Sequence, residues 1–174
     1  MKDILQYKND DDKVILLSKS EPIERHDYPD SLKEMFVDLE FHVKGDPKTG
    51  RRCWALSGIQ LGHQYRIMCM QYGSDIIYIA NPVVIRTYGD ASQNSEGCSS
   101  IMNGESNYWV RRYTIIKVKA LRVVFEDNIP KFKPVILKEH GLYSAILQHE
   151  IDHMDGITLF ERMHLGAAKK LEDK

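Results

Sequence analysis

The chain has 174 residues, of which 43% are hydrophobic and 28% are charged, and its formal net charge is -1 at pH 7. That length fits one domain with a proper core, and the composition is that of an ordinary soluble globular protein. The charge gives no indication of nucleic acid or an anionic membrane as a partner. No run approaches the roughly 20 apolar residues of a membrane span, and the polar, acidic N-terminus is unlike a signal peptide. We therefore expect a single cytoplasmic domain over residues 1–174.

The first third of the chain is expected to hold one clear helix. Residues 4–24 mix an apolar run with turn-forming Asp and Asn, and they predict an extended lead-in. Residues 29–45 predict a helix that begins near Pro29 and ends at Gly45. Its helically spaced positions are Leu32, Met35, Phe36, Leu39 and His42.

The middle of the chain predicts strands. β-branched and aromatic residues dominate residues 65–72 and 75–89, which predict two strands. The pair Asn81-Pro82 interrupts the second strand, because proline cannot donate to a sheet ladder. Apolar and charged residues alternate over residues 108–127, which predicts one long strand or a hairpin.

Helical spacing returns near the C-terminus, over residues 140–156, and Gly156 is the expected end of this helix. The residues at this spacing are Leu142, Ala145, Ile146, His149 and His153. Residues 159–174 predict a further short helix. Strands first and a helix late predict an α+β fold, with mixed or antiparallel strands packed around a central helix in the C-terminal half.

That helix carries a His-Glu-x-x-His motif. Residues four apart share one helix face, so His149 and His153 can point at one metal ion. Glu150 lies about 100° further round, beside the ion, where a carboxylate can exchange protons with bound water. The alternative is a chance match between two surface histidines, and the helical context favours the metal site.

Two histidines need a third ligand, because catalytic metal sites normally keep three protein ligands and one open position. Downstream, Glu161 and His164 do not fit the spacing of the metzincin proteases. Upstream, Cys98 follows Gly97 in a short polar turn and offers a thiolate. Taken alone, Cys98 is more simply explained as a small buried residue. The cysteines Cys53, Cys69 and Cys98 are odd in number and widely spaced, which favours a reduced compartment over a disulfide framework.

The two motifs together resemble the peptide deformylase family. Its second motif, Glu-Gly-Cys-Leu-Ser, is similar to EGCSS at residues 96–100, and its third, Gln-His-Glu-x-Asp-His-Leu-x-Gly, is similar to QHEIDHMDG at residues 148–156. The first motif, Gly-x-Gly-x-Ala-Ala-x-Gln, aligns with residues 53–60 and keeps Gln60. In that stretch Cys53 and Ala55 stand where the family has glycines. The order of all three motifs agrees over nearly the whole chain, so the chain resembles a divergent member.

This resemblance implies a metal-dependent hydrolase that removes the N-formyl group from the first methionine of new peptides and releases formate. It implies that Cys98, His149 and His153 hold one divalent ion, with ferrous iron expected in the cell and zinc, nickel or cobalt as alternatives. Glu150 is expected to move the proton. The side-chain amide of Gln60 and the backbone N–H of Ser99 are expected to stabilise the negative charge on the formyl oxygen.

The resemblance also implies substrate-binding and supporting residues. The altered first motif is expected to align with the peptide backbone as an added strand, and an apolar slot is expected to take the methionine side chain. These substrate contacts are expected from Trp54, Ala55, Ser57, Gly58, Leu142, Ala145 and Ile146. Glu96 and Arg112 match family positions that form a buried ion pair steadying the cysteine loop. Formyl-methionyl peptides are the implied partners, and the ribosome near its exit tunnel is a further candidate.

Other interpretations stay open from the sequence alone. A His-Glu-x-x-His metallopeptidase would need a third ligand downstream. A catalytically impaired deformylase-like protein that only binds peptides is favoured by one feature, the altered loop from Cys53 to Gly58. A purely structural zinc site would need a fourth residue ligand. Formate release from formyl-methionyl peptides separates these classes.

Overall fold

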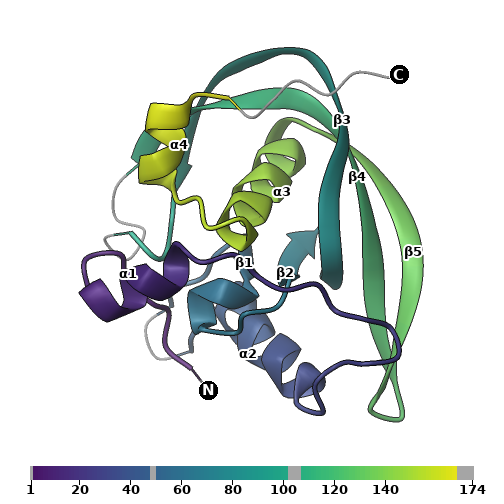
Figure 1. The fold of residues 1–174 in the computed structure, drawn as a ribbon. Coiled ribbons are helices and arrows are strands. Elements are labelled where there is room, and N and C mark those ends of the chain that lie inside the picture. Colours follow the sequence, from purple (N-terminus) through teal and green to yellow (C-terminus); the bar gives the residue numbers. More distant parts are fainter. Residues whose placement is uncertain (1, 48–49, 102–106, 168–174) are drawn as a thin grey trace.

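The computed structural model describes residues 2–47, 50–101 and 107–167. Its five strands are β1 (Ala55–Ser57), β2 (Ile67–Tyr72), β3 (Asp75–Gly97), β4 (Asn107–Glu126) and β5 (Ile129–His140). They form one sheet in the order β1-β2-β3-β4-β5, and each neighbouring pair is antiparallel. Figure 1 shows the sheet curling, with helix α3 (Gly141–Met154) inside the curl. The α+β class is therefore confirmed, and the strands of this sheet are antiparallel.

The two faces of the curled sheet bury two different cores. On the concave face, α3 packs its apolar residues against Ile116, Val118 and Ala120 of β4. On the other face lies α2 (Leu32–Lys44), which buries four of the five expected positions. The fifth, His42, is half-buried, and Val43 is buried in its place. The C-cap of α2 is Gly45, as predicted. Because strand side chains alternate between faces, β4 supplies Val123 to this second core.

The N-terminal lead-in differs from its prediction. Residues Asp10–Leu16 form helix α1, where the sequence was expected to be extended. The side chain of Asn9 accepts hydrogen bonds from the backbone N–H groups of Asp11 and Asp12. Three aspartates in the first turn also stabilise the helix, because their negative charges lie at the positive end of the helix dipole. The Asn and Asp residues that indicated a turn therefore cap a short helix.

The strand region is longer than the sequence indicates. The interruption at Asn81-Pro82 is a register shift within β3, where Asn81 has a φ of 51°. Beyond Gly89, β3 continues to Gly97 and so reaches the cysteine loop. The predicted strand at residues 108–127 is β4, which forms a hairpin with β5. Asp127 and Asn128 make the turn with φ of 49° and 67°, the conformation of a two-residue hairpin loop.

Two further elements complete the description. The 3-10 helix η1 (Gly58–Leu61) follows β1 directly, and α4 (Leu159–Leu165) follows α3 after a short turn. The predicted tail helix is thus present over Leu159–Leu165, while residues 168–174 lie outside the described part of the chain. Together, β3, η1 and α3 bring residues from three distant segments to one place.

Gly156 follows Asp155, the C-cap residue of α3, and allows a prediction about stability. Its φ is 73°, and a Cβ atom there would overlap the carbonyl group of Leu17. We expect Gly156→Ala to lower the free energy of unfolding by about 2–4 kcal/mol, since backbone strain and overpacking add. Urea denaturation measures this change.

Gly89 is the matched control for this substitution. Its φ is 67°, but a Cβ there meets no atom within 4 Å. Gly89→Ala introduces the backbone strain alone, so it should lower the free energy of unfolding by about 1 kcal/mol. Equal costs for the two variants would show that the close approach to Leu17 does not limit this position.

Candidate metal centre and active-site cavity

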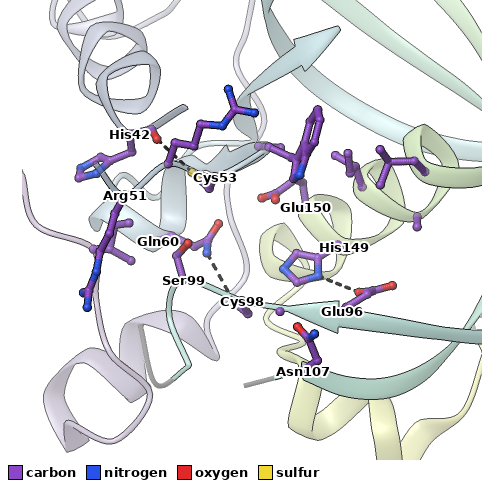
Figure 2. Close-up of a pocket in the computed structure, with 18 of the residues that line it drawn as sticks. His42, Arg51, Cys53, Gln60, Glu96, Cys98, Ser99, Asn107, His149 and Glu150 are labelled. Atoms are coloured by element: carbon purple, nitrogen blue, oxygen red, sulfur yellow. Dashed lines mark hydrogen bonds and ion pairs between the residues drawn. The ribbon is translucent and has the colours of Figure 1, made fainter. Parts of the chain in front are cut away.

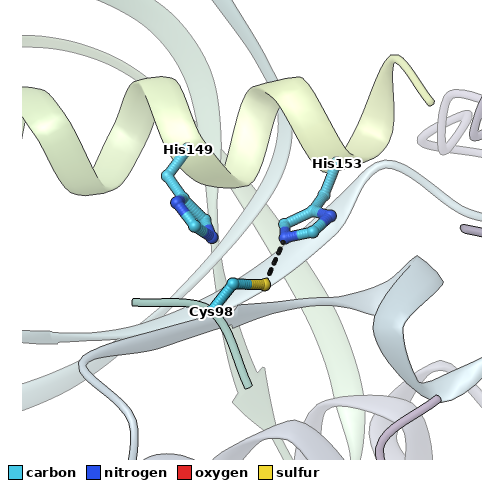
Figure 3. Close-up of side chains that lie close together, drawn as sticks. All are labelled: Cys98, His149 and His153. Carbon is cyan, nitrogen blue, oxygen red and sulfur yellow. Dashed lines mark hydrogen bonds between the residues drawn. The ribbon is translucent and has the colours of Figure 1, made fainter. Parts of the chain in front are cut away.

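Three ligand atoms meet where the end of β3 faces α3. The helical period places His149 and His153 one turn apart on the same face. Cys98 comes directly after β3, whose last residue is Gly97. One ligand atom from each of these side chains lies within 4.8 Å of the other two. Figure 3 shows the thiol below the two rings, with Cys98 Sγ 3.2 Å from His153 Nε2.

The ring of His149 is oriented by Glu96. Its Nδ1 lies 2.9 Å from Glu96 Oε2, which leaves Nε2 for a metal (Figure 2). Burial alone would raise the pKa of Glu96, but hydrogen bonds with His149 and Arg112 hold that pKa well below its usual value. The carboxylate therefore stays ionised and keeps the proton of His149 on Nδ1.

His153 is suited to act as a neutral ligand. Burial lowers its pKa well below the ordinary value, and the nearby charges of His149 and Arg112 lower it further. Its Nδ1 is buried and has no hydrogen-bond partner among the residues that the structure describes. A neutral imidazole is the form that binds a metal.

Behind the ligands lies a buried network of two carboxylates and two guanidinium groups. Arg112 donates to both oxygens of Glu96, at 2.8 and 2.9 Å. Arg112 also bonds Asp152, and Asp152 accepts from Arg162, with Nε 2.8 Å from Oδ2. All four side chains are at most 10% exposed. The network links the end of β3 to β4, α3 and α4, and Cys98 follows β3 two residues after Glu96, so the network helps to hold the sulfur near the rings.

Gln60 points its amide into the same space from η1. Its Oε1 accepts from both the backbone N–H and the hydroxyl of Ser57, each at 3.0 Å. Its Nε2 therefore faces the ligands, 3.1 Å from Ser100 Oγ and 3.8 Å from Cys98 Sγ. Because these contacts fix which end of the amide is the donor, Gln60 is a preset N–H donor beside the thiol (Figure 2).

Glu150 is buried next to this group. Burial raises its pKa above the ordinary value. Its Oε2 has no hydrogen-bond partner among the described residues, although the side chain is only 4% exposed. An unpartnered buried carboxyl oxygen with a raised pKa is the state expected of a group that exchanges protons.

A cavity of about 740 Å³ opens onto these residues. Cys98, Gln60, Ser99, His149 and Glu150 line it. Trp54, Ala55, Leu142, Ala145 and Ile146, the expected apolar contacts, line it as well. The exposed fractions of Trp54 and Leu142 are 50% and 54%, which fits walls of a cavity better than core positions.

Ser57 and Gly58, also expected at the substrate, are not among the residues that line the cavity. Ser57 is fully buried and serves to orient Gln60. At Gly58 a Cβ atom would lie 2.7 Å from Cγ1 of Ile67, so this position needs a glycine for packing. At these two positions the altered first motif therefore orients Gln60 and allows close packing, rather than lining the cavity.

The alternative third ligand Glu161 is occupied elsewhere. It accepts hydrogen bonds from Tyr7, at 2.8 Å, and from Thr158.

The three cysteines are free thiols, and burial raises the pKa of Cys53 to about 12. Of the cysteines, Cys98 lies in the group of described residues that could hold a metal ion.

Comparisons with known proteins identify the family. A family model described as polypeptide deformylase matches residues 1–169. The chain belongs to the peptide deformylase family. A peptide deformylase of Pelotomaculum thermopropionicum is 34% identical over 131 residues, which cover 75% of this chain and 73% of the relative. One of Natranaerobius thermophilus is 28% identical over 160 residues, covering 91% and 92%.

Solved structures agree with this assignment. The crystal structure of a peptide deformylase from Legionella pneumophila has a TM-score of 0.72 and 25% identity, and the match covers 93% of this chain and 85% of that one. A peptide deformylase from Synechococcus elongatus in complex with actinonin has a TM-score of 0.72 at 23% identity, covering 93% and 78%, which shows the fold. Family membership confirms the metal-dependent deformylase expected from the motifs. No helix in the described part of the chain is long and apolar enough to cross a membrane.

Sequence reasoning missed part of the supporting network. Arg162 lies in α4 and belongs to no deformylase motif quoted from the sequence, yet it bonds Asp152. Asp152 stands next to the candidate ligand His153, but the carboxylate that bonds a histidine ring is Glu96, which lies 2.9 Å from His149 Nδ1. The available signal was an acidic residue directly before a histidine of the His-Glu-x-x-His motif in α3, and the identity of its partner depended on where α4 packs.

Proposed function

We propose that the chain removes the formyl group from formyl-methionyl peptides through Cys98, His149 and His153, with Glu150 as the proton-transferring group. The observation that carries this proposal is the meeting of one thiol and two imidazoles beside an unpartnered buried carboxyl group. Among the described residues, this group contains three ligands and no fourth. A metal ion held there would keep one coordination position open, as in catalytic metal sites.

The donor set fits a divalent transition metal. One sulfur and two imidazole nitrogens suit ferrous iron, zinc, cobalt or nickel. When bound, such an ion lowers the pKa of water and polarises a carbonyl oxygen. We propose ferrous iron in the cell and zinc or nickel after aerobic purification, since a thiolate ligand and ferrous iron both oxidise readily.

The chain's own residues divide the remaining work. Glu150 takes a proton from the attacking water and delivers it to the leaving nitrogen, so that formate and a free amino terminus result. The Nε2 of Gln60 and the backbone N–H of Ser99 donate to the formyl oxygen as its negative charge grows. Gln60 is already oriented for this by Ser57, which lowers the cost of reorganisation.

We propose that the methionine side chain of the substrate packs against the apolar residues that line one part of the cavity. Trp54 approaches from the β1 side, and Leu142, Ala145 and Ile146 approach from the first turns of α3. One turn further along α3, His149 and Glu150 begin the reactive centre. The formyl group of a peptide whose methionine fills this slot would therefore lie near the ligands.

Formate release tests the proposal directly. Protein purified without oxygen and loaded with iron should release one formate per cleaved formyl-methionyl peptide. An acetylated peptide of the same sequence is the control for other amide hydrolysis. If fully metal-loaded protein released no formate, the proposed activity would be contradicted. Cleavage within unformylated peptides would indicate a peptidase.

Gln60→Met provides a sharper test of the oxyanion donor. The substitution keeps the side-chain volume and removes the N–H donor, so kcat should fall by roughly 10²- to 10³-fold. Metal content, measured by elemental analysis, should stay at one per chain. Gln71→Met, near the end of β2, is the control, and it should leave kcat unchanged. A normal kcat in Gln60→Met would assign the oxyanion to other groups.

The setting of the reaction is also a proposal. We propose that residues 1–174 act as one domain organised around α3, because α3 contributes to the main core and to the metal centre. The three free thiols fit a reducing, cytoplasmic location. Nascent chains are the source of formyl-methionyl termini, so we propose action near the ribosomal exit tunnel, which co-sedimentation with translating ribosomes would test.

A further inference from the structure

The open edge of β1 sets the direction in which a peptide leaves the reactive centre. β1 is the end strand of the sheet and pairs with β2 on one side. Gln60, beside the metal ligands, follows the C-terminal end of β1. A peptide that pairs with this edge and has its formyl group there runs back along β1, antiparallel to it, towards residues 54, 53 and 52.

Backbone pairing along this edge stops at Cys53. Its backbone N–H donates to the carbonyl of His42, at 3.2 Å, and its thiol points to the same carbonyl (Figure 2). The loop before β1 therefore meets α2 and has no free N–H at that residue. The backbone N–H of Cys53 cannot therefore donate to a peptide, which directs attention to the side chains that line the cavity beside this residue.

Arg52, next to Cys53, is placed to contact the peptide. It lines the cavity, and its guanidinium carbon lies 5.5 Å from the centre of the Trp54 ring, in the geometry of a cation–π contact. Among the described residues, Trp54 is its partner and no carboxylate forms an ion pair with it. The arginine is thus held in place by an aromatic ring while its hydrogen-bond donors stay available.

The spacing along an extended peptide selects one residue of the substrate. Side chains two apart lie on one face of an extended segment, about 6.6 Å apart. Arg52 and Trp54 are two apart, and Trp54 forms a wall of the proposed methionine slot. A methionine beside Trp54 therefore places the third residue of the peptide beside Arg52.

Other charged side chains also line the cavity. Arg51, Asp3 and Asp46 line the cavity together with Arg52, as do Glu96 and Glu150, so the net charge of the cavity does not favour an anion. Arg51 and Asp46 already interact within the chain. The position of Arg52 relative to β1, rather than the sum of charges, carries the selectivity.

We propose that Arg52, held over Trp54, forms a subsite for an acidic side chain at the third residue of formyl-methionyl peptides. This subsite rests on the proposed function, because it uses the same cavity and the same peptide direction. An aspartate or glutamate there pairs with the guanidinium at the cavity mouth. The pair is partly exposed to water, so its effect is a preference among substrates rather than a requirement.

Matched peptides test the subsite. Formyl-Met-Ala-Glu, formyl-Met-Ala-Gln and formyl-Met-Ala-Lys, all with amidated C-termini, differ at the third residue only. The glutamate peptide should have a kcat/KM roughly two- to fivefold above the glutamine peptide, mainly through KM, and the lysine peptide should be the poorest. The preference should shrink in about 0.5 M salt, as ion pairs are screened. Arg52→Gln should remove the preference, and Arg52→Glu should reverse it.

Controls separate this subsite from general charge effects and from the activity itself. Lys119→Glu makes the same change of charge as Arg52→Glu, but at an exposed position on β4 outside the cavity, and it should keep the wild-type order of the peptides. Calorimetric binding of the products Met-Ala-Glu and Met-Ala-Gln decides the subsite even without turnover. Equal affinities for the two products, or an unchanged preference in Arg52→Glu, would overturn the subsite. Failure to cleave any of the peptides would instead contradict the proposed function.

Discussion

Replacing Glu150 with alanine is expected to lower kcat/KM for formyl-methionyl peptides by roughly 10²- to 10⁴-fold while one metal ion per chain is retained. Glu150 lies on the same helix as the ligand histidines but is not one of the three converging ligands. Its buried Oε2 has no partner among the described residues, so its loss leaves no broken contact at that oxygen that would shift the ligands. Steady-state kinetics and elemental analysis on the same preparation measure the two quantities.

Two further variants make this result interpretable. Glu150→Gln keeps the size of the side chain and cannot take a proton, so it should lose activity to a similar degree. Glu126→Ala, at the exposed end of β4, is the matched control and should keep full activity. Full activity in Glu150→Gln would assign proton transfer to another group, and loss of metal in that variant would make Glu150 a structural residue.

The second large effect is expected at Arg112. Its guanidinium is 4% exposed and lies between Glu96 and Asp152. Arg112→Ala would leave two buried carboxylates with fewer partners, which should cost about 3–5 kcal/mol of stability. For a domain of this size that corresponds to a fall in Tm of about 10 °C. Because Glu96 orients His149, metal affinity should fall as well.

The neighbouring arginine is a stringent control. Arg111 is adjacent in β4 but exposed, and it donates to the carbonyl of Ala91 at 2.8 Å. Arg111→Ala should change stability by about 0.5 kcal/mol or less and should keep the metal. Thermal unfolding followed by circular dichroism, together with metal content, compares the two variants. If Arg112→Ala kept wild-type metal content and activity, the network would have no role in supporting the site.

Much of the fold followed from local patterns. The helix at residues 29–45 and the strands at 65–72 and 108–127 were predictable because their side-chain periods differ, and each period reflects which face is buried. The short α1 was missed because Asn and Asp favour both turns and helix starts. Which state forms depends on the hydrogen bonds that follow, and here Asn9 caps a helix.

The substrate cavity was less predictable than the ligands. A four-residue spacing on a helix determines that His149 and His153 point the same way, whatever surrounds them. By contrast, Gly58 and Arg52 lie close to each other in the sequence, yet one packs against β2 and the other lines the cavity. Nothing in their local pattern separates them, since the difference arises from how β1 and η1 pack.

Local patterns predicted a helix that carries two imidazoles and a carboxylate, and the resemblance to the deformylase motifs selected Cys98 as their partner. Packing of the folded chain settled how these groups meet. It places Cys98 3.2 Å from His153 and sets Glu96 against His149, although each pair is more than 50 positions apart in the sequence. The physical reason is range, because helical periodicity is a property of neighbouring residues, whereas these contacts depend on how a curled sheet closes around α3.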